Sequence, residues 1–162
     1  MTLEPTASHD YFRHTQRVYW EDTDAGGIVY YANYLKFLER TRTEWLRSHG
    51  YDQGELARGE GIVFVVRSVN VEFLRPARLD DLIVVRIENV DAGASVVRLR
   101  QYIECGSERI VSADVKLACV KLSALQPVRI PAALRAILTN RPQPFEAVSI
   151  SVVTPRSQEK TE

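Results

Sequence analysis

The chain has 162 residues, and its 21 Lys plus Arg balance its 21 Asp plus Glu, so the formal net charge is zero. A length of this order suits a single domain with one core. A neutral balance gives no reason to expect nucleic acid or an anionic membrane as the partner, so the composition favours a small-molecule site. Cys105 and Cys119 lack metal-site spacing, so both are predicted to be small strand residues and a disulfide framework is not expected.

The two ends of the chain differ from its middle. Residues 1–10 carry acids and no apolar run, which is unlike a secretory signal, and no segment approaches the roughly 18 apolar residues that span a bilayer. Residues 142–162 combine prolines with a polar run that buries too little surface to offset its ordering entropy, although 148–153 has the pattern of a short strand. We therefore predict a cytoplasmic protein with a flexible N-terminus at 1–10, one domain at 11–140 and a mostly disordered tail at 141–162.

The first half of the domain is predicted to hold one strand and one long helix. Residues 11–20 have the pattern of a strand that ends at an acidic, glycine-containing turn. Residues 30–49 repeat apolar and aromatic side chains at helical spacing, and Gly50 supplies a stop. This pattern predicts a helix of about 20 residues, about 30 Å long. Its aromatic side chains are expected in the core or at an interface: Tyr30, Tyr34 and Trp45.

The second half of the domain is predicted to be mostly strand. After a polar connector at 51–61, residues 62–73 begin as an apolar run, then alternate, and stop before Pro76 because proline cannot donate to a strand ladder. Short connections favour antiparallel hairpins between the later strands. Those later elements are three strands at 82–90, 95–105 and 108–122, and a short closing helix at 131–138.

The order of these elements predicts an α+β fold. A single helix can cover only one face of a five-stranded sheet, so we expect the sheet to curl around the helix. An apolar edge would remain at strand 62–73 or at the last two strands, and a second copy of the chain can pair with it. We therefore expect a homo-oligomer.

The segment Glu21–Ile28 places acids beside paired glycines at the entrance to the helix. A carboxylate can act as a base or nucleophile, glycines allow close backbone approach, and free N–H groups at a helix start can hold a developing negative charge. These properties make the segment a candidate site for chemistry, in which an acid such as Asp24 could act as a base or nucleophile. Spacing alone leaves two other roles open, because Asp24 could cap the helix, or could bind a metal together with Asp22. The metal role lacks further acids or a phosphate-binding motif.

The motif also carries a family resemblance. The run from Arg17 to Tyr34, RVYWEDTDAGGIVYYANY, and the following FLERTRTE at 37–44 resemble the Tol-Pal-associated acyl-CoA thioesterases, a branch of the 4-hydroxybenzoyl-CoA thioesterase-like hotdog proteins. The similarity continues to Val128. It implies a hotdog fold, in which a curled antiparallel sheet wraps one long central helix, and homodimers or homotetramers with acyl-CoA sites between protomers.

The resemblance also implies roles for particular residues. Asp24 would carry the catalysis, and the backbone N–H of Tyr31 would bind the thioester carbonyl oxygen. Because a thiolate leaves readily, one carboxylate and one such donor suffice, and no metal or cofactor is expected beyond CoA as part of the substrate. Asp24 would either attack the carbonyl to form an anhydride or deprotonate a water. Substrate contacts are expected along the loop that follows the acid, at Gly26, Gly27, Ile28, Val29 and Tyr30.

Neighbouring positions receive more modest predictions. Asp22 is expected to serve the turn, and Glu39 on the helix is the reserve catalytic acid. Some hotdog relatives have proline where this chain has Ala25, so the loop is expected to be less rigid here. The phosphates of CoA need positive charge, for which the candidates are Arg67, Arg75, Arg78, Arg98 and Arg100.

Two other functions remain open from the sequence. The acyl donor could be an acyl carrier protein, in which case activity would depend on the carrier. Alternatively, the chain could be a non-catalytic protein of envelope lipid metabolism that binds acyl ligands or a partner, in which case it would bind acyl-CoA without turnover. The intact motif argues against this last function.

Overall fold

The computed structural model describes residues 12–140. The predictions of flexible ends and of a strand at 148–153 concern residues that lie outside this range. Within it the elements follow the predicted order, with bounds as follows: β1 (Phe12–Arg17), η1 (Trp20–Asp22), α1 (Asn33–Ser48), α2 (Gln53–Glu55), η2 (Leu56–Glu60), β2 (Ile62–Phe73), β3 (Leu82–Ala92), β4 (Val96–Cys105), β5 (Glu108–Lys121), β6 (Gln126–Pro127) and α3 (Ala132–Thr139).

The structure departs from the sequence prediction most in three places. The first strand stops at Arg17, because the residues after it turn into the 3-10 helix η1. The long helix begins at Asn33, since Tyr31 and Ala32 form a turn before it. The polar connector contains the helical turns α2 and η2, which the sequence pattern did not predict.

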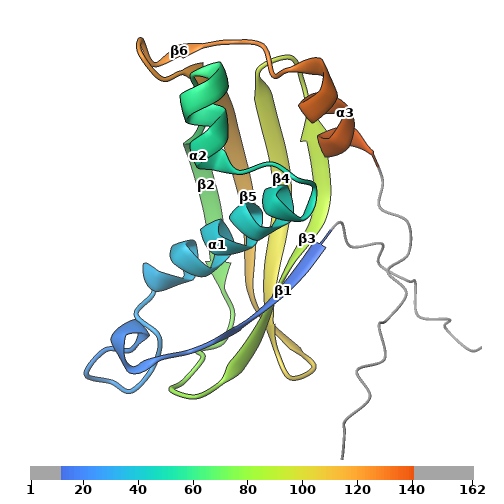
Figure 1. The fold of residues 1–162 in the computed structure, drawn as a ribbon. Coiled ribbons are helices and arrows are strands. Elements are labelled where there is room, and N and C mark those ends of the chain that lie inside the picture. Colours follow the sequence, from blue (N-terminus) through green and yellow to red (C-terminus); the bar gives the residue numbers. More distant parts are fainter. Residues whose placement is uncertain (1–11, 141–162) are drawn as a thin grey trace, which may run out of the picture.

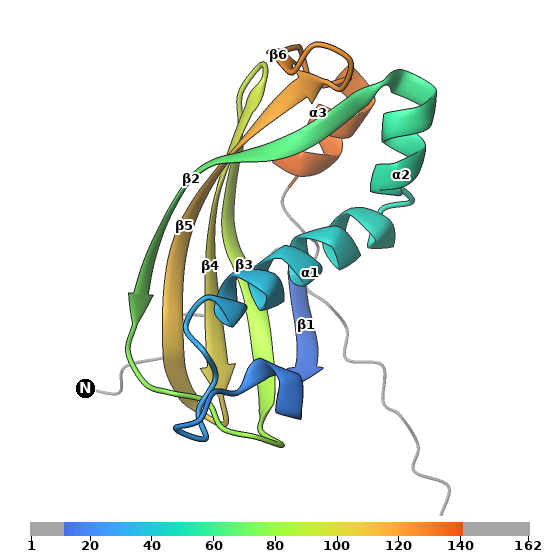
Figure 2. The same cartoon turned by 90° about the vertical axis from the view of Figure 1, so that its left-hand side faces the viewer.

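The strands form one antiparallel sheet in the order β1-β3-β4-β5-β2, with β6 paired to the end of β5. Short connections make β3, β4 and β5 successive hairpins, as predicted, whereas β2 lies at the far edge beside β5. Figure 1 shows α1 crossing in front of the sheet, and Figure 2 shows the sheet curling past it. This is the hotdog architecture that the sequence predicted.

The buried face of α1 builds the core. Tyr34, Phe37, Leu38, Thr41 and Trp45 recur at three- and four-residue steps and are all buried. Burying one large apolar side chain of this kind contributes about 1.5–3 kcal/mol, so this stripe holds the helix against the sheet. The prediction of a core position is confirmed for Tyr34 and Trp45, whereas Tyr30 is 45% exposed.

Two buried glutamines fix how α1 sits on the sheet. Gln16 of β1 donates through Nε2 to the carbonyl oxygen of Phe37 at 2.9 Å and to Thr41 Oγ1 at 3.0 Å. Gln101 of β4 donates to the carbonyl oxygen of Leu38 at 3.1 Å. Because a buried amide is costly unless it is hydrogen-bonded, these bonds favour one position of the helix along the sheet.

The cysteines agree with their predicted role as small strand residues. Cys119 is buried on β5 and Cys105 is partly buried on β4, and both are free thiols. Burial raises the pKa of each thiol. Among residues 12–140 the structure contains no helix that is long and apolar enough to cross a membrane.

Candidate active site

The glycine-containing motif folds into a tight turn. Its two arms pair at an isolated bridge between Thr23 and Val29. The N–H of Asp24 donates to the Ile28 carbonyl oxygen at 3.0 Å, and the N–H of Gly27 donates to the Asp24 carbonyl oxygen at 2.9 Å. Gly27 has φ of 72°, a left-handed conformation that glycine adopts without a steric penalty. The second glycine is therefore required by the turn itself.

The carboxylate of Asp24 is exposed and held in one orientation. Its Oδ1 accepts from the N–H of Gly26 at 2.8 Å, and its other oxygen has no hydrogen-bond partner within residues 12–140. A Cβ at Gly26 would lie 3.0 Å from Oδ1, so a larger residue there would crowd the carboxylate. The N-cap of α1 is Ala32, so Asp24 does not cap that helix. One carboxylate oxygen thus remains available for chemistry.

Asp22 has a structural position, in agreement with its predicted role in the turn. Its side chain is buried at 3% exposure, and Oδ2 accepts from the N–H of Tyr19 at 2.8 Å. Its carbonyl oxygen accepts from the N–H of Tyr30 and from Asn33 Nδ2, both at 2.9 Å. Asp22 therefore ties the start of the motif to the entrance of α1.

Replacing Asp22 with alanine is expected to destabilise the fold, because the Tyr19 N–H would lose its carboxylate acceptor. The expected loss is about 1–3 kcal/mol of unfolding free energy. Urea unfolding followed by circular dichroism measures it. The matched control is Asp24→Ala, since Asp24 is exposed. Equal stability of Asp22→Ala and the wild type would contradict the structural role.

A solvent-open cleft of about 430 Å³ lies at Asp24. Four of its lining residues were not predicted as site residues: Thr23 and Ala25 lie within the motif, whereas Trp20 and Leu79 lie outside it. Trp20 is 79% exposed beside the motif, and its exposure could not be read from the sequence. Leu79 comes from the segment between β2 and β3. It lies far from the motif in the sequence, so nothing in the motif indicated that Leu79 lines this cleft. The full lining is Trp20, Thr23, Asp24, Ala25, Gly27 and Leu79.

The remaining predicted contact residues lie on the second arm of the turn. Ile28 is bridged to Arg78, and the N–H of Val29 donates to the Ala77 carbonyl oxygen at 2.9 Å. The Val29 side chain is buried in the core. Tyr30 is exposed, and a hydrogen bond with the Tyr31 side chain raises the pKa of Tyr30. Thus Asp24, Gly26 and Gly27 gather at the turn, whereas Ile28, Val29, Tyr30 and Tyr31 lead away from it to α1.

The backbone N–H of Tyr31 lies just before α1 and donates to no acceptor within residues 12–140. The Ala32 N–H likewise donates to no acceptor within those residues, whereas the Asn33 N–H donates to the Tyr30 carbonyl oxygen at 2.8 Å. A free N–H at a helix entrance, aligned with the helix dipole, can bind a developing oxyanion. The Tyr31 ring centroid lies 6.0 Å from that of Phe73, so this helix entrance lies at the end of β2.

The five candidate arginines separate into two groups. Three have carboxylate partners: Arg75 with Glu108 at 3.5 Å, Arg98 with Asp91 at 3.6 Å, and Arg100 with Asp114 at 2.8 Å. No carboxylate oxygen lies within 4 Å of the guanidinium nitrogens of Arg67 or Arg78 among the residues that the structure describes, although the backbone N–H of Arg78 donates to Asp81 Oδ2 at 2.8 Å. Their charges are therefore the ones available to a phosphate.

Comparison with known proteins identifies the family of this chain. Residues 18–138 match the model of the thioesterase-like superfamily. The chain is 39% identical over 120 residues to acyl-CoA thioesterase YbgC of Haemophilus influenzae, covering 74% of this chain and 88% of that protein. It is 40% identical over 126 residues to acyl-CoA thioester hydrolase YbgC of Escherichia coli O6:H1, and this match covers 77% of this chain and 93% of that protein.

A solved structure extends the likeness to three dimensions. The crystal structure of a probable thioesterase from Bartonella henselae superimposes with a TM-score of 0.70 at 37% identity, covering 74% of this chain and 98% of that one. The region that the family model matches, residues 18–138, contains the whole turn with Asp24, the long helix and every strand of the sheet except β1. The chain therefore belongs to the thioesterase-like superfamily.

Proposed function

We propose that the chain is an acyl-CoA thioesterase that hydrolyses an acyl-CoA to the free acid and CoA. The observation that carries this proposal is the exposed Asp24 carboxylate, which the Gly26 N–H orients while one oxygen stays free. The curated YbgC relatives are named as acyl-CoA thioesterases, which supports the same activity. The cytoplasmic location predicted from the sequence is part of the proposal.

Asp24 and Tyr31 divide the chemistry in this proposal. In one route the Asp24 carboxylate attacks the thioester carbon, the C–S bond breaks, and water then hydrolyses the resulting anhydride. In the other route Asp24 takes a proton from a water that attacks the same carbon, and the thiolate leaves with a proton. In both routes the carbonyl oxygen becomes negative, and the Tyr31 N–H donates to it. One such donor typically contributes about 3–4 kcal/mol to transition-state stabilisation.

We propose that the active unit is a homodimer formed through β2. Within residues 12–140, β2 pairs only with β5, so its other edge has unpaired N–H and C=O groups. Its helix-facing side chains Val66, Val69 and Phe73 are 52%, 39% and 48% exposed. Two copies of an edge strand related by a two-fold axis pair antiparallel. Such pairing would cover this apolar surface and join the two sheets.

The experiment that tests the activity is free-thiol release from short, medium, long and aromatic acyl-CoAs, compared with the same acyl groups on acyl carrier protein. We expect turnover of at least one class of CoA thioester. If only the acyl carrier protein thioesters were hydrolysed, the acyl donor would be the carrier protein and not CoA. If the protein bound acyl-CoA without releasing thiol, it would be a ligand-binding protein and not an enzyme.

The two arginines without carboxylate partners give a prediction about CoA. Arg67→Gln and Arg78→Gln are each expected to raise the KM for acyl-CoA by about 3- to 10-fold, because a phosphate loses a charge-assisted contact. The KM for the same acyl group on N-acetylcysteamine, which has no phosphate, should not change. Arg100→Gln is the matched control, since Asp114 already neutralises Arg100. Equal effects on both thioesters would contradict phosphate binding.

A further inference from the structure

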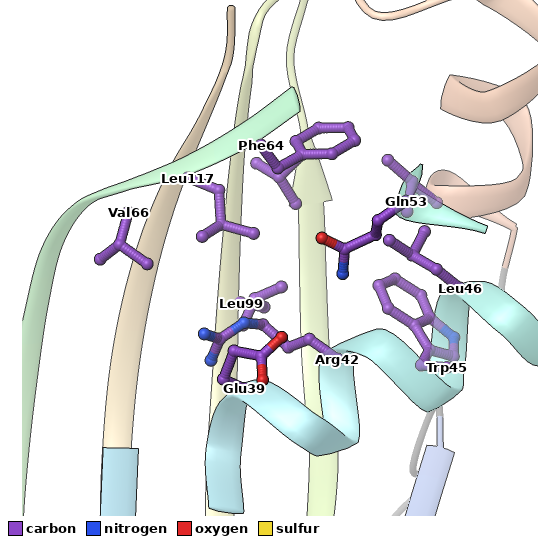
Figure 3. Close-up of a pocket in the computed structure, with 11 residues that line it drawn as sticks. Glu39, Arg42, Trp45, Leu46, Gln53, Phe64, Val66, Leu99 and Leu117 are labelled. Atoms are coloured by element: carbon purple, nitrogen blue, oxygen red, sulfur yellow. The ribbon is translucent and has the colours of Figure 1, made fainter. Parts of the chain in front are cut away.

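A second cavity lies apart from the Asp24 cleft, between the C-terminal half of α1 and the inner face of the sheet. Its volume is about 90 Å³, and it shares no lining residue with that cleft. Figure 3 shows apolar side chains from β2, β4 and β5 facing polar and aromatic side chains from α1. The polar side chains in its wall are Glu39, Arg42 and Gln53.

Arg42 is the unusual member of this wall. Its guanidinium donates from Nη1 to Gln101 Oε1 at 2.8 Å, and Gln101 is fully buried and bonded in turn to the Leu38 carbonyl oxygen. No carboxylate oxygen lies within 4 Å of the Arg42 nitrogens among the described residues. Burial lowers the pKa of Arg42, although nearby Glu39 acts in the opposite direction. Arg42 is therefore a partly buried cation whose side-chain hydrogen-bond partner is a neutral amide.

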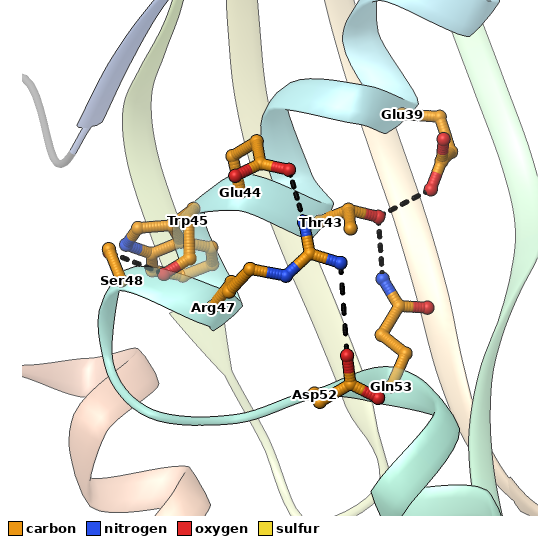
Figure 4. A network of polar contacts seen from close by, with 8 residues as sticks. All are labelled: Glu39, Thr43, Glu44, Trp45, Arg47, Ser48, Asp52 and Gln53. Atoms are coloured by element: carbon orange, nitrogen blue, oxygen red, sulfur yellow. Dashed lines mark hydrogen bonds and ion pairs between the residues drawn. The ribbon is translucent and has the colours of Figure 1, made fainter.

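The other two polar side chains are engaged with each other through Thr43. The Thr43 hydroxyl donates to Glu39 Oε1 at 2.6 Å and accepts from Gln53 Nε2 at 2.8 Å, as Figure 4 shows. Glu39 is exposed, so water screens much of its charge. The guanidinium of Arg42 keeps unused N–H donors at the wall of an apolar cavity, and a planar guanidinium matches a carboxylate in two parallel bonds.

The proposed dimer would bring this cavity to a catalytic loop. Phe64 and Val66 line the cavity near the start of β2, whereas Tyr31 contacts Phe73 at its end. Antiparallel pairing of two β2 strands about an axis near their middle sets the start of one strand beside the end of the other. The cavity of one protomer would then adjoin the Asp24 turn and the Tyr31 N–H of its partner.

We infer that this cavity receives the far end of the acyl group, and that Arg42 selects acyl groups that end in a carboxylate. The inference rests on the proposed thioesterase function and its dimer. The volume of the cavity suits the end of an acyl chain. For comparison, a dry cavity of about 150 Å³ binds benzene. A cavity of about 90 Å³ is smaller, so it favours a short aliphatic terminus over an aromatic ring.

The test compares glutaryl-CoA with pentanoyl-CoA, which have chains of equal length ending in a carboxylate and in a methyl group. Rates are corrected for spontaneous hydrolysis. For the wild type we expect kcat/KM to favour glutaryl-CoA by about 10-fold or more, since one charge-assisted contact is worth that much. Arg42→Met should remove this preference, mainly through KM for glutaryl-CoA. Arg42→Lys keeps the charge and should retain part of it.

The outcomes separate the cavity assignment from the wider function. Turnover of both thioesters by the wild type without a preference for glutaryl-CoA overturns the role of Arg42 and leaves the thioesterase function standing. An equal fall of both activities in Arg42→Lys also overturns it, because a purely structural role would act on both substrates. Arg42→Lys keeps a donor near Gln101, so it remains informative if Arg42→Met fails to fold. If the protein hydrolysed no acyl-CoA at all, the proposed function would be wrong, and this inference, which depends on it, would be wrong as well.

Discussion

Asp24→Asn is expected to lower kcat for thioester hydrolysis by about 100- to 10,000-fold, because the amide can neither attack the thioester carbon nor accept a proton from water. The fold should persist, since Asp24 is exposed and the Asn Oδ1 can still accept from the Gly26 N–H. Thiol release under saturating acyl-CoA measures the effect. Circular dichroism and the oligomeric state of the variant establish that it is folded.

The matched control for this substitution is Glu39→Gln on α1. Glu39 is exposed and bonded to Thr43, and it is the reserve acid from the sequence. If Asp24→Asn kept wild-type activity while Glu39→Gln lost it, the catalytic assignment would move to Glu39. Single-turnover hydrolysis in ¹⁸O-labelled water tests the anhydride route for Asp24. Label in the Asp24 carboxylate indicates an anhydride that water opens at the Asp24 carbon, whereas label only in the released acid excludes that opening.

Val69→Asp is expected to convert the proposed dimer to monomers and to abolish most activity. Val69 lies on the helix-facing side of β2, next to the bulge between Val66 and Ser68, and is 39% exposed. In the dimer both protomers would bury an unpaired carboxylate near the axis. Such burial costs several kcal/mol, so the dissociation constant should rise by at least about 100-fold. Sedimentation velocity across a concentration series measures it.

Leu125→Asp is the matched control for the interface. Leu125 is 67% exposed in the turn between β5 and β6, beyond the start of β2 rather than along the strand, and its φ of 53° is one that Asp tolerates. This variant should keep the wild-type oligomeric state and activity. A monomeric but fully active Val69→Asp would show that each protomer works alone, and would remove the inter-protomer cavity from the mechanism.

The sequence by itself determined the long helix, the five long strands and their order along the chain. The apolar stripe from Tyr34 to Trp45 predicted α1, because a helix brings residues three and four apart to one face. One helix and five strands then required a curled sheet, and the motif around Asp24 predicted the loop that carries the exposed carboxylate.

Only the tertiary structure decided which distant residues meet. Gln101 occupies an inward position of β4 that the pattern alone would assign to an apolar residue, and it becomes the anchor of Arg42 only because α1 crosses β4 there. Leu79 joins the Asp24 cleft through a segment far along the chain. Local periodicity reports which face of an element is buried, whereas side-chain partners depend on how the elements pack. For that reason the sequence predicted the carboxylate of Asp24, whereas the fold was needed to identify Arg42, the cation that we propose selects the substrate.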